Sequence, residues 1–512
     1  MLENIFGRST SKRARPSPDA SEPEKKPESR ILGDLEIIKN FLFDYFKGTV
    51  DLVFREVSLF SDVKGLLVYF SGLANDTILN RDVLHSFCMN TQTLDFHAVR
   101  RDPSLLRQIV SVANVDIESD LQKAADILLD GTSVLFVDHL AVAVLINSKD
   151  YEKRAISEPS NETVIRGPKE SFIEDIQTNM MLLRRKIKNH RLVFKSVTLG
   201  SQTSTPIAIA YLDGIAREDV IKEVNTRLEA IDTDAILDAG MIEQYIEDHR
   251  FSLFPTIANT EKPDVAAAKL LEGRVGILCG GSPHMMTVPT LFIEYFQTSE
   301  DYYNRFYFAQ VMRFLRYICF LITTMLPAIY VALQVFHQEM IPTVLLVKMS
   351  GAMSGIPFPT VIEALIMIFF YEVLREAGTR LPRVIGPAIS IVGALIVGEA
   401  SVNAGLVSST IVIVVALSAI CSFALPGLLE PIIILRLVFV FAGGFLGLFG
   451  VVCGVYLVII HLCSLQSFGM EYTSPFATFN IRNLRDSLLR YPLAMLKTRP
   501  AGIVGRNKTR QK

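Results

Sequence analysis

The sequence predicts a multi-pass α-helical membrane domain of about five spans, plus or minus one, preceded by a two-part α/β soluble region. Two observations support this class. Between Pro289 and Ser464 the chain carries long apolar segments with almost no charge, most clearly Ile411–Leu425 and Pro431–Cys463. The part before Pro289, roughly 290 residues, has an ordinary polar composition and is long enough for two small domains with separate cores.

These changes of composition divide the 512 residues into five parts. We predict a disordered N-terminal tail (1–30), an α-rich soluble subdomain (31–148), an α/β soluble subdomain (149–288), a transmembrane domain (289–464) and a basic cytoplasmic C-terminal tail (465–512). Residues 8–30 are charged and rich in Pro and Ser, without the apolar stretch of a signal peptide.

The first subdomain is expected to be mostly amphipathic helix with one hairpin. Apolar residues recur at helical spacing near its start, at Leu35, Ile38, Phe41, Leu42 and Tyr45. Two β-type runs near its end, Ser133–Val137 and Ala141–Asn147, flank Asp138-His139 and predict the hairpin. His139 is therefore interpreted as a turn residue.

The second subdomain combines helical and β-type patterns. Gly167-Pro168 predicts a helix start, since Pro at the first helical position gives up no needed hydrogen bond. A further helix is predicted from about Arg217 to Ala230, and three strands are predicted at Leu192–Thr198, Pro206–Tyr211 and Arg274–Leu278. The Gly-rich residues 280–284 lack the ending of a P-loop and are interpreted as a plain turn that leads to the membrane.

Catalytic and cofactor signatures are missing from the sequence. The net charge of −2 argues against a polyanion binder, so no nucleic acid partner is expected. The six cysteines form no CxxC pair and no Cys/His cluster, so neither a disulfide framework nor a metal site is supported. Without a nucleophile elbow, an HExxH motif or a kinase signature, we expect no enzyme activity and no cofactor.

Five apolar stretches predict the spans: Phe314–Phe336, Phe358–Leu374, Val384–Val397, Leu406–Leu425 and Pro431–Cys463. Tyrosines and arginines ahead of the first stretch have the character of an interfacial anchor: Tyr302, Tyr303, Arg305, Tyr307, Arg313 and Arg316. These bases, and the nine Lys and Arg after Ser464, favour the cytoplasmic side for both ends of the domain.

An odd number of crossings conflicts with that orientation, because five would leave the basic tail outside. The last stretch is too long for one untilted span, and Gly443-Gly444 or the residues from Gly447 to Gly450 offer places for a bend into two passes. Alternatively, Phe358–Leu374, which has Glu363 and Glu372 in or near it, lies in the interface or re-enters.

Ionisable groups at membrane depth are candidates for function. Glu399 and Asn403 are four residues apart and share a helix face if the Val384 helix continues, which makes them candidates for lining a cation pore. The alternative is that both lie in the outer headgroup layer. Glu363, Glu430 and Arg436 are further polar candidates, and interfacial placement is favoured for Glu430 and Arg436.

Several motifs in a fixed order resemble the GerA family of spore germination proteins, specifically the A subunit of germinant receptors. They are EPSNETVIRGPKESFIEDIQTN (158–179), FSLFPTIANTEKPD (251–264), GRVGIL (273–278), PFPTVIEAL (357–365), LREAGTRLP (374–382) and SFGMEYTSPF (467–476). The resemblance implies a subunit in the inner membrane of a dormant spore with cytoplasmic soluble domains. It also implies a transporter-like B subunit and a lipoprotein C subunit as partners, and homo-oligomers that form a ligand-gated cation channel.

Two other functions stay open. One is a sporulation-specific paralogue that amplifies ion release without sensing a germinant. The other is a secondary transporter, which would have paired inverted repeats around a midplane site. No internal repeat is evident in the sequence, which counts against the transporter.

Overall fold

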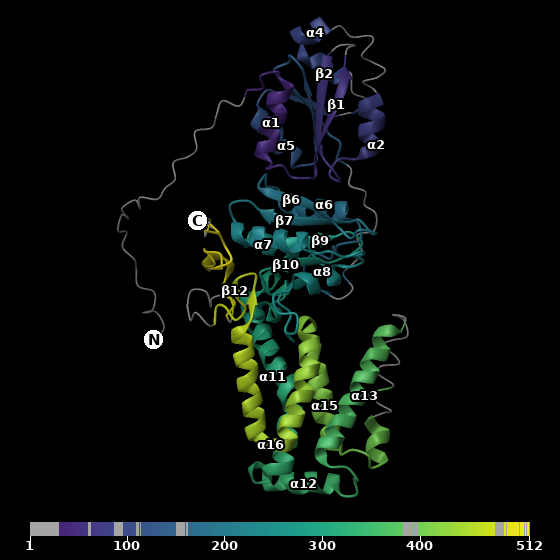
Figure 1. Cartoon of the computed structure of the whole chain (residues 1–512), viewed down its shortest axis with the longest axis vertical. Coiled ribbons are helices and arrows are strands. Elements are labelled where there is room, and N and C mark those ends of the chain that lie inside the picture. The colour runs from purple at the N-terminus through teal and green to yellow at the C-terminus, as the bar shows by residue number, and fades with distance from the viewer. Residues whose placement is uncertain are drawn as a thin grey trace, which may run out of the picture.

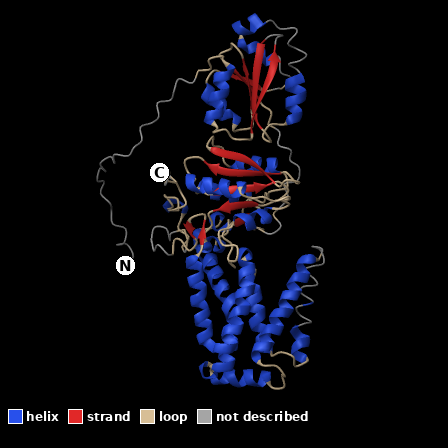
Figure 2. Cartoon of the chain, viewed as in Figure 1, coloured by secondary structure: helices blue, strands red, loops and turns tan. Residues whose placement is uncertain are grey.

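The computed structural model stacks two α/β layers on a bundle of helices (Figure 1, Figure 2). The polypeptide enters at the far α/β layer and passes through the second layer into the bundle, and the C-terminal residues return beside the second layer. The structure describes residues 30–59, 63–85, 96–108, 112, 114–149, 159, 162–381, 393, 398–476, 486–487, 489–500, 502–505, 507 and 509–510.

The first subdomain is a five-stranded antiparallel sheet in the order β1-β2-β4-β5-β3. Its strands are β1 (Leu52–Leu59), β2 (Val63–Phe70), β3 (Val115–Glu118), β4 (Ser133–Val137) and β5 (Ala143–Ile146). Helices α1 (Leu35–Tyr45) and α5 (Leu121–Leu128) cover one face. The other face is covered by η1 (Leu79–Leu84), which follows α2 (Asp76–Ile78), and by α4 (Phe96–Arg101) and η2 (Pro103–Gln108).

The second subdomain is also a five-stranded antiparallel sheet, in the order β6-β7-β9-β10-β8. Its strands are β6 (Leu192–Leu199), β7 (Thr205–Leu212), β8 (Ala258–Thr260), β9 (Val275–Cys279) and β10 (Met285–Val288). Helices α6 (Ile176–Lys186) and α9 (Pro263–Leu271) cover one face. Helices α7 (Glu218–Glu229) and α8 (Ala239–Ile246) cover the other.

The two subdomains are tandem copies of one fold. Both have the same strand order, and Gly65 pairs with Val137 in the first sheet as Ile207 pairs with Cys279 in the second. The same offset in residue number relates the β4·β5 and β3·β5 pairs to the β9·β10 and β8·β10 pairs. The expectation of a chain without an internal repeat was therefore wrong.

Sequence traces of the duplication lie in the first hairpin of each copy. Strand β1 is LVFREVSL and β6 is LVFKSVTL, so the two share the apolar positions that face the core. Each second strand is followed by a Gly with positive φ, Gly72 (81°) and Gly214 (75°), and then by an aliphatic residue and Ala. Only Gly takes this left-handed conformation without steric cost, so the turn was kept in both copies.

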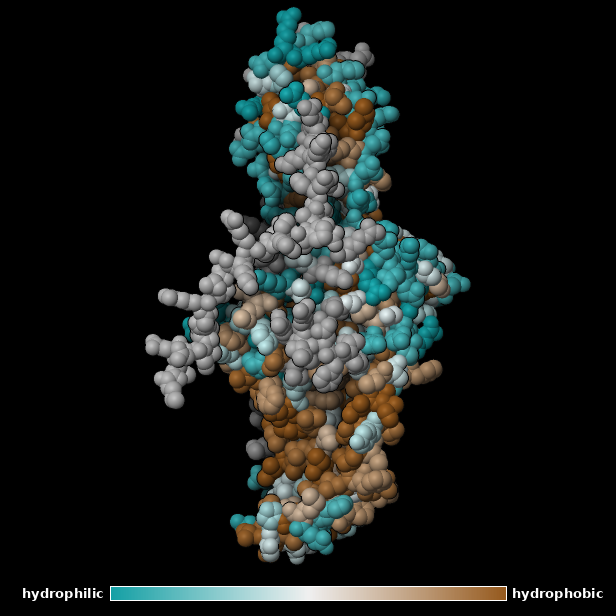
Figure 3. Space-filling view, turned by 90° about the vertical axis from the view of Figure 1, so that its left-hand side faces the viewer, coloured by the Kyte–Doolittle hydropathy of each residue, from teal (hydrophilic) through white to brown (hydrophobic). Residues whose placement is uncertain are grey.

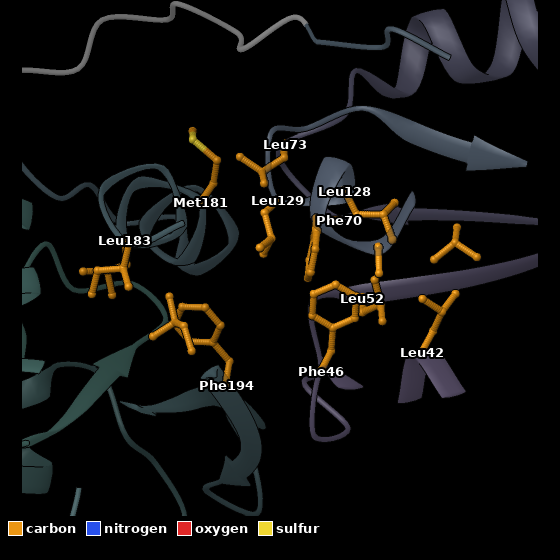
Figure 4. Close-up of a cluster of buried hydrophobic side chains, with 14 of the residues drawn as sticks. Leu42, Phe46, Leu52, Phe70, Leu73, Leu128, Leu129, Met181, Leu183 and Phe194 are labelled. Carbon is orange, nitrogen blue, oxygen red and sulfur yellow. The ribbon is translucent and has the colours of Figure 1, made fainter. Parts of the chain in front are cut away.

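One buried ion pair joins the copies. Arg184 of α6 donates from Nε and Nη2 to the carboxylate of Asp51 at 2.6 and 2.9 Å, and both side chains are buried. Its guanidinium also lies over the rings of Phe70 and Phe194. The apolar cluster around it continues from Phe46 and Leu129 of the first copy to Met181 and Phe194 of the second (Figure 4). The two copies therefore share one core.

The bundle is built from long apolar helices, and hydrophobic side chains gather over it on the face seen in Figure 3. Its helices are α11 (Phe306–Phe336), α12 (Thr343–Met353), α13 (Thr360–Arg380), α15 (Ser409–Ser422) and α16 (Leu429–Ser464), and short helices η3 (Phe292–Phe296) and α10 (Glu300–Tyr303) precede them. Among the described residues, two helical stretches are long and apolar enough to cross a membrane by length and composition, Phe306–Phe336 and Pro426–Ser464.

Helix α16 is a hairpin of two helical halves. Gly447 has φ 61° and ψ −150°, which interrupts the helix. A Cβ on Gly450 would meet the Ala442 carbonyl, and one on Gly454 would meet the ring of Phe439. Residues that far apart would be separated by roughly 12 Å or more in a straight helix, so the chain reverses at Gly447. This is one of the places at which a bend was predicted.

The first helix of the bundle begins, and the last helix ends, beside the second subdomain. The far end of α11 lies at the hairpin, because Gly447 contacts Phe336 and His337. The last turn of α16 returns to the second subdomain, where His461 Nε2 lies 3.1 Å from Ser252 Oγ. The bundle therefore makes an even number of passages between its two ends.

The C-terminal residues are part of the second subdomain. After β11 (Gln466–Ser467) and β12 (Met470–Glu471), Tyr472 is buried and donates to the Pro255 carbonyl at 2.8 Å. Further on, after η7 (Leu493–Met495), Val504 forms a β-bridge with Ala216. The described part of the basic tail is thus packed against the protein.

Three predictions for the soluble half had different outcomes. The hairpin at Asp138-His139 is confirmed as β4 and β5, but the first subdomain is α/β, not α-rich. The helix expected at Gly167-Pro168 begins only at Ile176, where Asp175 caps it by accepting from Thr178 N at 2.8 Å. Residues 280–284 turn the chain into β10 and not directly into the membrane.

Two of the predicted segments lie largely outside the described residues. They are the disordered tail at 1–30, of which only Arg30 is described, and the span Val384–Val397, of which only Gly393 is described.

We expect Asp51→Ala to destabilise the soluble half by about 3–5 kcal/mol, because it leaves Arg184 buried without its charge partner. Hydrogen exchange of peptides from β1 and β6, followed against urea concentration, measures this loss. Asp130→Ala, which breaks an exposed pair with Lys188, is the matched control and should change the stability by less than about 1 kcal/mol. Equal effects of the two substitutions would contradict the role given to Asp51.

Candidate functional site

Three charged side chains, one buried and two half-buried, form a cluster toward the subdomain end of the bundle. Glu372 of α13 pairs with Arg375 at 2.5 Å and also with Arg436 of α16. Arg436 is fully buried, donates to Ser418 Oγ at 3.3 Å and lies over the ring of Tyr371. One carboxylate thus balances two arginines and ties α13, α15 and α16 together. Arg436 was expected in the interface, but it lies in the protein interior.

Glu363 fixes the other end of the same helices. Its side chain is fully buried, and Oε2 accepts from the backbone N of Ser408 at 2.9 Å. Ser408 is the N-cap of α15, so the carboxylate lies at the positive end of the helix dipole. Its Oε1 has no hydrogen-bond partner among the described residues. Glu363 therefore has a clear structural role in holding α13 against α15.

Glu399 and Asn403 differ from these residues because both side chains are exposed. Residues 398–403 are helical, so the two share one helix face, as predicted. The segment ends at Gly405, which lies beside Gly355 at the end of the bundle remote from the soluble half. Within the described residues, neither side chain is brought into the Glu372 cluster or to Glu363.

Glu430 lies at the joint between the bundle and the second subdomain. It is exposed and lines a cavity of about 440 Å³ together with Glu243, which is in α8, and Glu247, which directly follows α8. Burial raises the pKa of Glu243 to about 7, and the negative charges of Glu247 and Glu430 add to the shift. Asn259 Nδ2 donates to Glu243 at 2.6 Å and partly offsets it. The cavity therefore brings three carboxyl groups together between the two parts.

The arginines predicted as an interfacial anchor are instead part of a buried junction. Arg313 and Arg316 both bind the buried carboxylate of Asp301, at 3.3 and 2.9 Å. Arg313 also donates to the carbonyls of Asp486 and Ser487 in the C-terminal tail, at 2.6 and 3.2 Å. Burial raises the pKa of the Asp486 carboxyl. The start of α11 is thus fixed between the second subdomain and the tail.

Sequence reasoning found Glu363, Glu430 and Arg436 but missed the acidic cavity and the partners of Arg436. Glu372 and Arg375 were visible as charges three residues apart on one helix, a spacing that predicts a pair. No sequence signal connected them with Arg436, because that contact runs between helices. Glu243 is one of many acidic residues in the soluble half and carries no signal of its own.

Fold and site together define a class of protein in which a duplicated α/β domain is carried on an apolar helical bundle whose charges are paired internally. The sequence matches the Bacillus/Clostridium GerA spore germination protein family over residues 40–502. The chain therefore belongs to the GerA family, as the motifs indicated, and has a role in spore germination.

Two relatives and one solved structure are similar to this chain. Spore germination protein KA of Bacillus subtilis is 42% identical over 465 residues, which cover 90% of this chain and 85% of the relative. The uncharacterized membrane protein YfkQ of the same organism is 38% identical over 457 residues, covering 89% and 88%. The N-terminal domain of the A subunit of the Bacillus megaterium spore germinant receptor GerK3, a crystal structure, is 29% identical and matches 52% of this chain and 99% of that one with a TM-score of 0.41.

We expect Glu372→Gln to destabilise the bundle by about 3–5 kcal/mol, because Arg375 and Arg436 then lose their common charge partner inside the protein. Denaturant unfolding of the detergent-solubilised chain measures the loss. Glu376→Gln on the same helix removes an exposed pair with Arg380 and should cost less than about 1 kcal/mol. If Arg436→Met did not lessen the effect of Glu372→Gln, the unpaired-charge explanation would be wrong.

The contact between α8 and the start of α16 should weaken as the pH rises. The raised pKa of Glu243 means that its protonated form favours the joined state, a contribution that is complete below the ordinary value of 4.5 and is lost as the pH rises through about 7. Hydrogen exchange of residues 426–432, corrected for the intrinsic rate, measures the contact at about pH 5 and about pH 8.

Glu243→Gln should remove this pH dependence, because its amide does not ionise in this range. Glu229→Gln on the exposed side of α7 serves as the control and should leave it unchanged. The same pH dependence in the Glu243 variant and the parent would rule out Glu243 as the titrating group.

Proposed function

We propose that this chain is the A-type membrane subunit of a nutrient germinant receptor, and that several copies assemble into a ligand-gated cation channel. The observation that carries the proposal is a contrast within the bundle. Glu363 and Glu372 contact polar groups of their own chain inside the bundle, whereas Glu399 and Asn403 are exposed on one helix face. An exposed carboxylate on an apolar bundle is expensive in lipid and therefore favours a position that faces water or another copy.

We further propose six crossings of the membrane. Five of them are α11, α13, α15 and the two halves of α16. The sixth is the predicted span Val384–Val397, because Arg380 and Gly405, which flank it in the sequence, are at opposite ends of the bundle. Each half of α16 has about 17 residues and a length of roughly 26 Å, which is close to the hydrocarbon thickness. Six agrees with the upper limit of the predicted number and with the need for an even count.

The orientation follows from charge. Both the soluble half and the tail lie at one end of the bundle, and the tail carries nine Lys and Arg. The positive-inside rule therefore supports a cytoplasmic position for the soluble half and the tail, in the inner membrane of the spore. A transporter-like B subunit and a lipoprotein C subunit are the proposed partners, by family resemblance, together with membrane lipid.

The two other functions are weighed on the same observations. The repeat in the chain lies in its soluble half, where it supplies no inverted pair of membrane helices, so it lends no support to a secondary transporter. The sporulation-specific paralogue would share the channel and lack germinant sensing. A gene for a transporter-like protein and one for a lipoprotein in the same operon would favour the receptor.

Replacing Glu399 and Asn403 together by Ala should change the rate of monovalent cation release when spores germinate, because the two polar groups would line the ion path. Flame photometry of the germination medium measures the release. Glu339→Ala is the matched control, since Glu339 is exposed on the turn after α11 at the same end of the bundle. Unchanged release in spores that hold normal amounts of the double variant would exclude both residues from the pore.

A further inference from the structure

The loop that follows α8 exposes an aromatic side chain completely. In the stretch His249-Arg250-Phe251, all three residues are exposed, and the ring of Phe251 has no cover from its own chain. Burial of an exposed Phe side chain in an apolar environment is favourable. A single exposed Phe is common on protein surfaces and indicates no function by itself. The location of Phe251 in the molecule is therefore what bears on its role.

The position of the loop is fixed against the last helix of the bundle. Ser252 Oγ lies 3.1 Å from His461 Nε2 and also accepts from the backbone N of Phe254 at 3.1 Å. Phe254 turns inward, where it is buried beside the rings of Phe292 and His461. The backbone is thus held on both sides of Ser252, and Phe251 is presented at the level of the final turn of α16.

The apolar outer surface of the bundle continues to this loop. On the second half of α16, which ends at Ser464, several large residues are exposed: Tyr456, Leu457, Ile459 and Ile460. Ile460 and Leu457 lie on the turn directly before His461, and the exposed Phe251 and Leu253 are the chain neighbours of Ser252, which contacts His461. The exposed aromatic ring therefore extends the surface that the proposed membrane would cover.

A basic side chain, Arg250, directly precedes Phe251 in the loop. Arg250 is exposed and uses one donor, Nη2, on the Tyr245 carbonyl at 3.2 Å, which leaves other guanidinium donors available. A guanidinium binds phosphate oxygens through charge-assisted hydrogen bonds. A Phe ring beside a base suits the boundary between headgroups and acyl chains, where surface-bound segments insert apolar side chains and hold anionic lipid with Lys or Arg.

We propose that residues 249–253 form a membrane-contact loop of the soluble half, in which Phe251 enters the boundary between headgroups and acyl chains and Arg250 binds lipid phosphate. The loop holds the second subdomain on the bilayer independently of the bundle that it is linked to. The inference goes beyond the proposed function and rests only on the bundle lying in a membrane.

The chain contains no Trp, so a single substitution supplies its only tryptophan fluorophore. The intact Phe251→Trp protein is reconstituted in vesicles of phosphatidylcholine and phosphatidylglycerol, and in the same vesicles with bromine on the acyl chains near the glycerol. Phe43→Trp, at an exposed Phe in the first subdomain, is the matched negative control. Phe449→Trp, at an exposed Phe of the bundle beside the α16 reversal, reports whether the bundle itself is inserted.

We expect the bromine to remove most of the emission of the Phe251→Trp protein and none of that of the Phe43→Trp protein. Quenching of the Phe449→Trp protein without quenching of the Phe251→Trp protein would overturn the membrane-contact loop and leave the bundle's position intact. A blue-shifted but unquenched emission from the Phe251→Trp protein would also overturn it, because it would show that another protein surface covers the ring. Absence of quenching in both would reject the membrane position of the bundle and the loop together.

Discussion

Asp301 joins the start of the bundle to the C-terminal tail. It is buried at the start of the bundle, where Arg313 and Arg316 of α11 converge on it, and its own backbone carbonyl accepts from Arg490 of the tail at 3.2 Å. A buried carboxylate without these arginines would be strongly unfavourable, so each part needs the others to be in place. The entry of the chain into the bundle and the packing of the tail thus depend on contacts with the same residue.

The duplicated domain explains why the tail returns. In the first copy, Ala74 forms a β-bridge with Lys149, in the chain that leaves the sheet after β5. In the second copy, the chain after β10 leads to the bundle, and the equivalent Ala216 is bridged by Val504 of the tail. The C-terminal residues therefore take the place that the linker holds in the first copy. Because the tail replaces the linker in this way, the last helix of the bundle is held beside the subdomain that precedes the first helix of the bundle.

The sequence predicted what is local and missed what is formed by pairing over long distances. The hairpin at Asp138-His139 was found from its residues alone. Strands β1 and β2 were missed because helical spacing in α1 was extended over the whole subdomain, although LVFREVSL and LVFKSVTL are alike. Arg436 was misplaced because its partner, Glu372, lies on another helix.

Polar groups in the bundle fall into two kinds, and the difference bears on how the protein changes state. The charges of Glu372 and the buried Arg436 are paired with each other, so they stabilise one arrangement of the helices and resist rearrangement. The acidic cavity at Glu243 and Glu430 is different, because like charges oppose each other across a joint between two parts. Such a joint separates at low cost, while the paired charges keep the bundle intact. Movement is therefore expected between the second subdomain and the bundle before it occurs within the bundle.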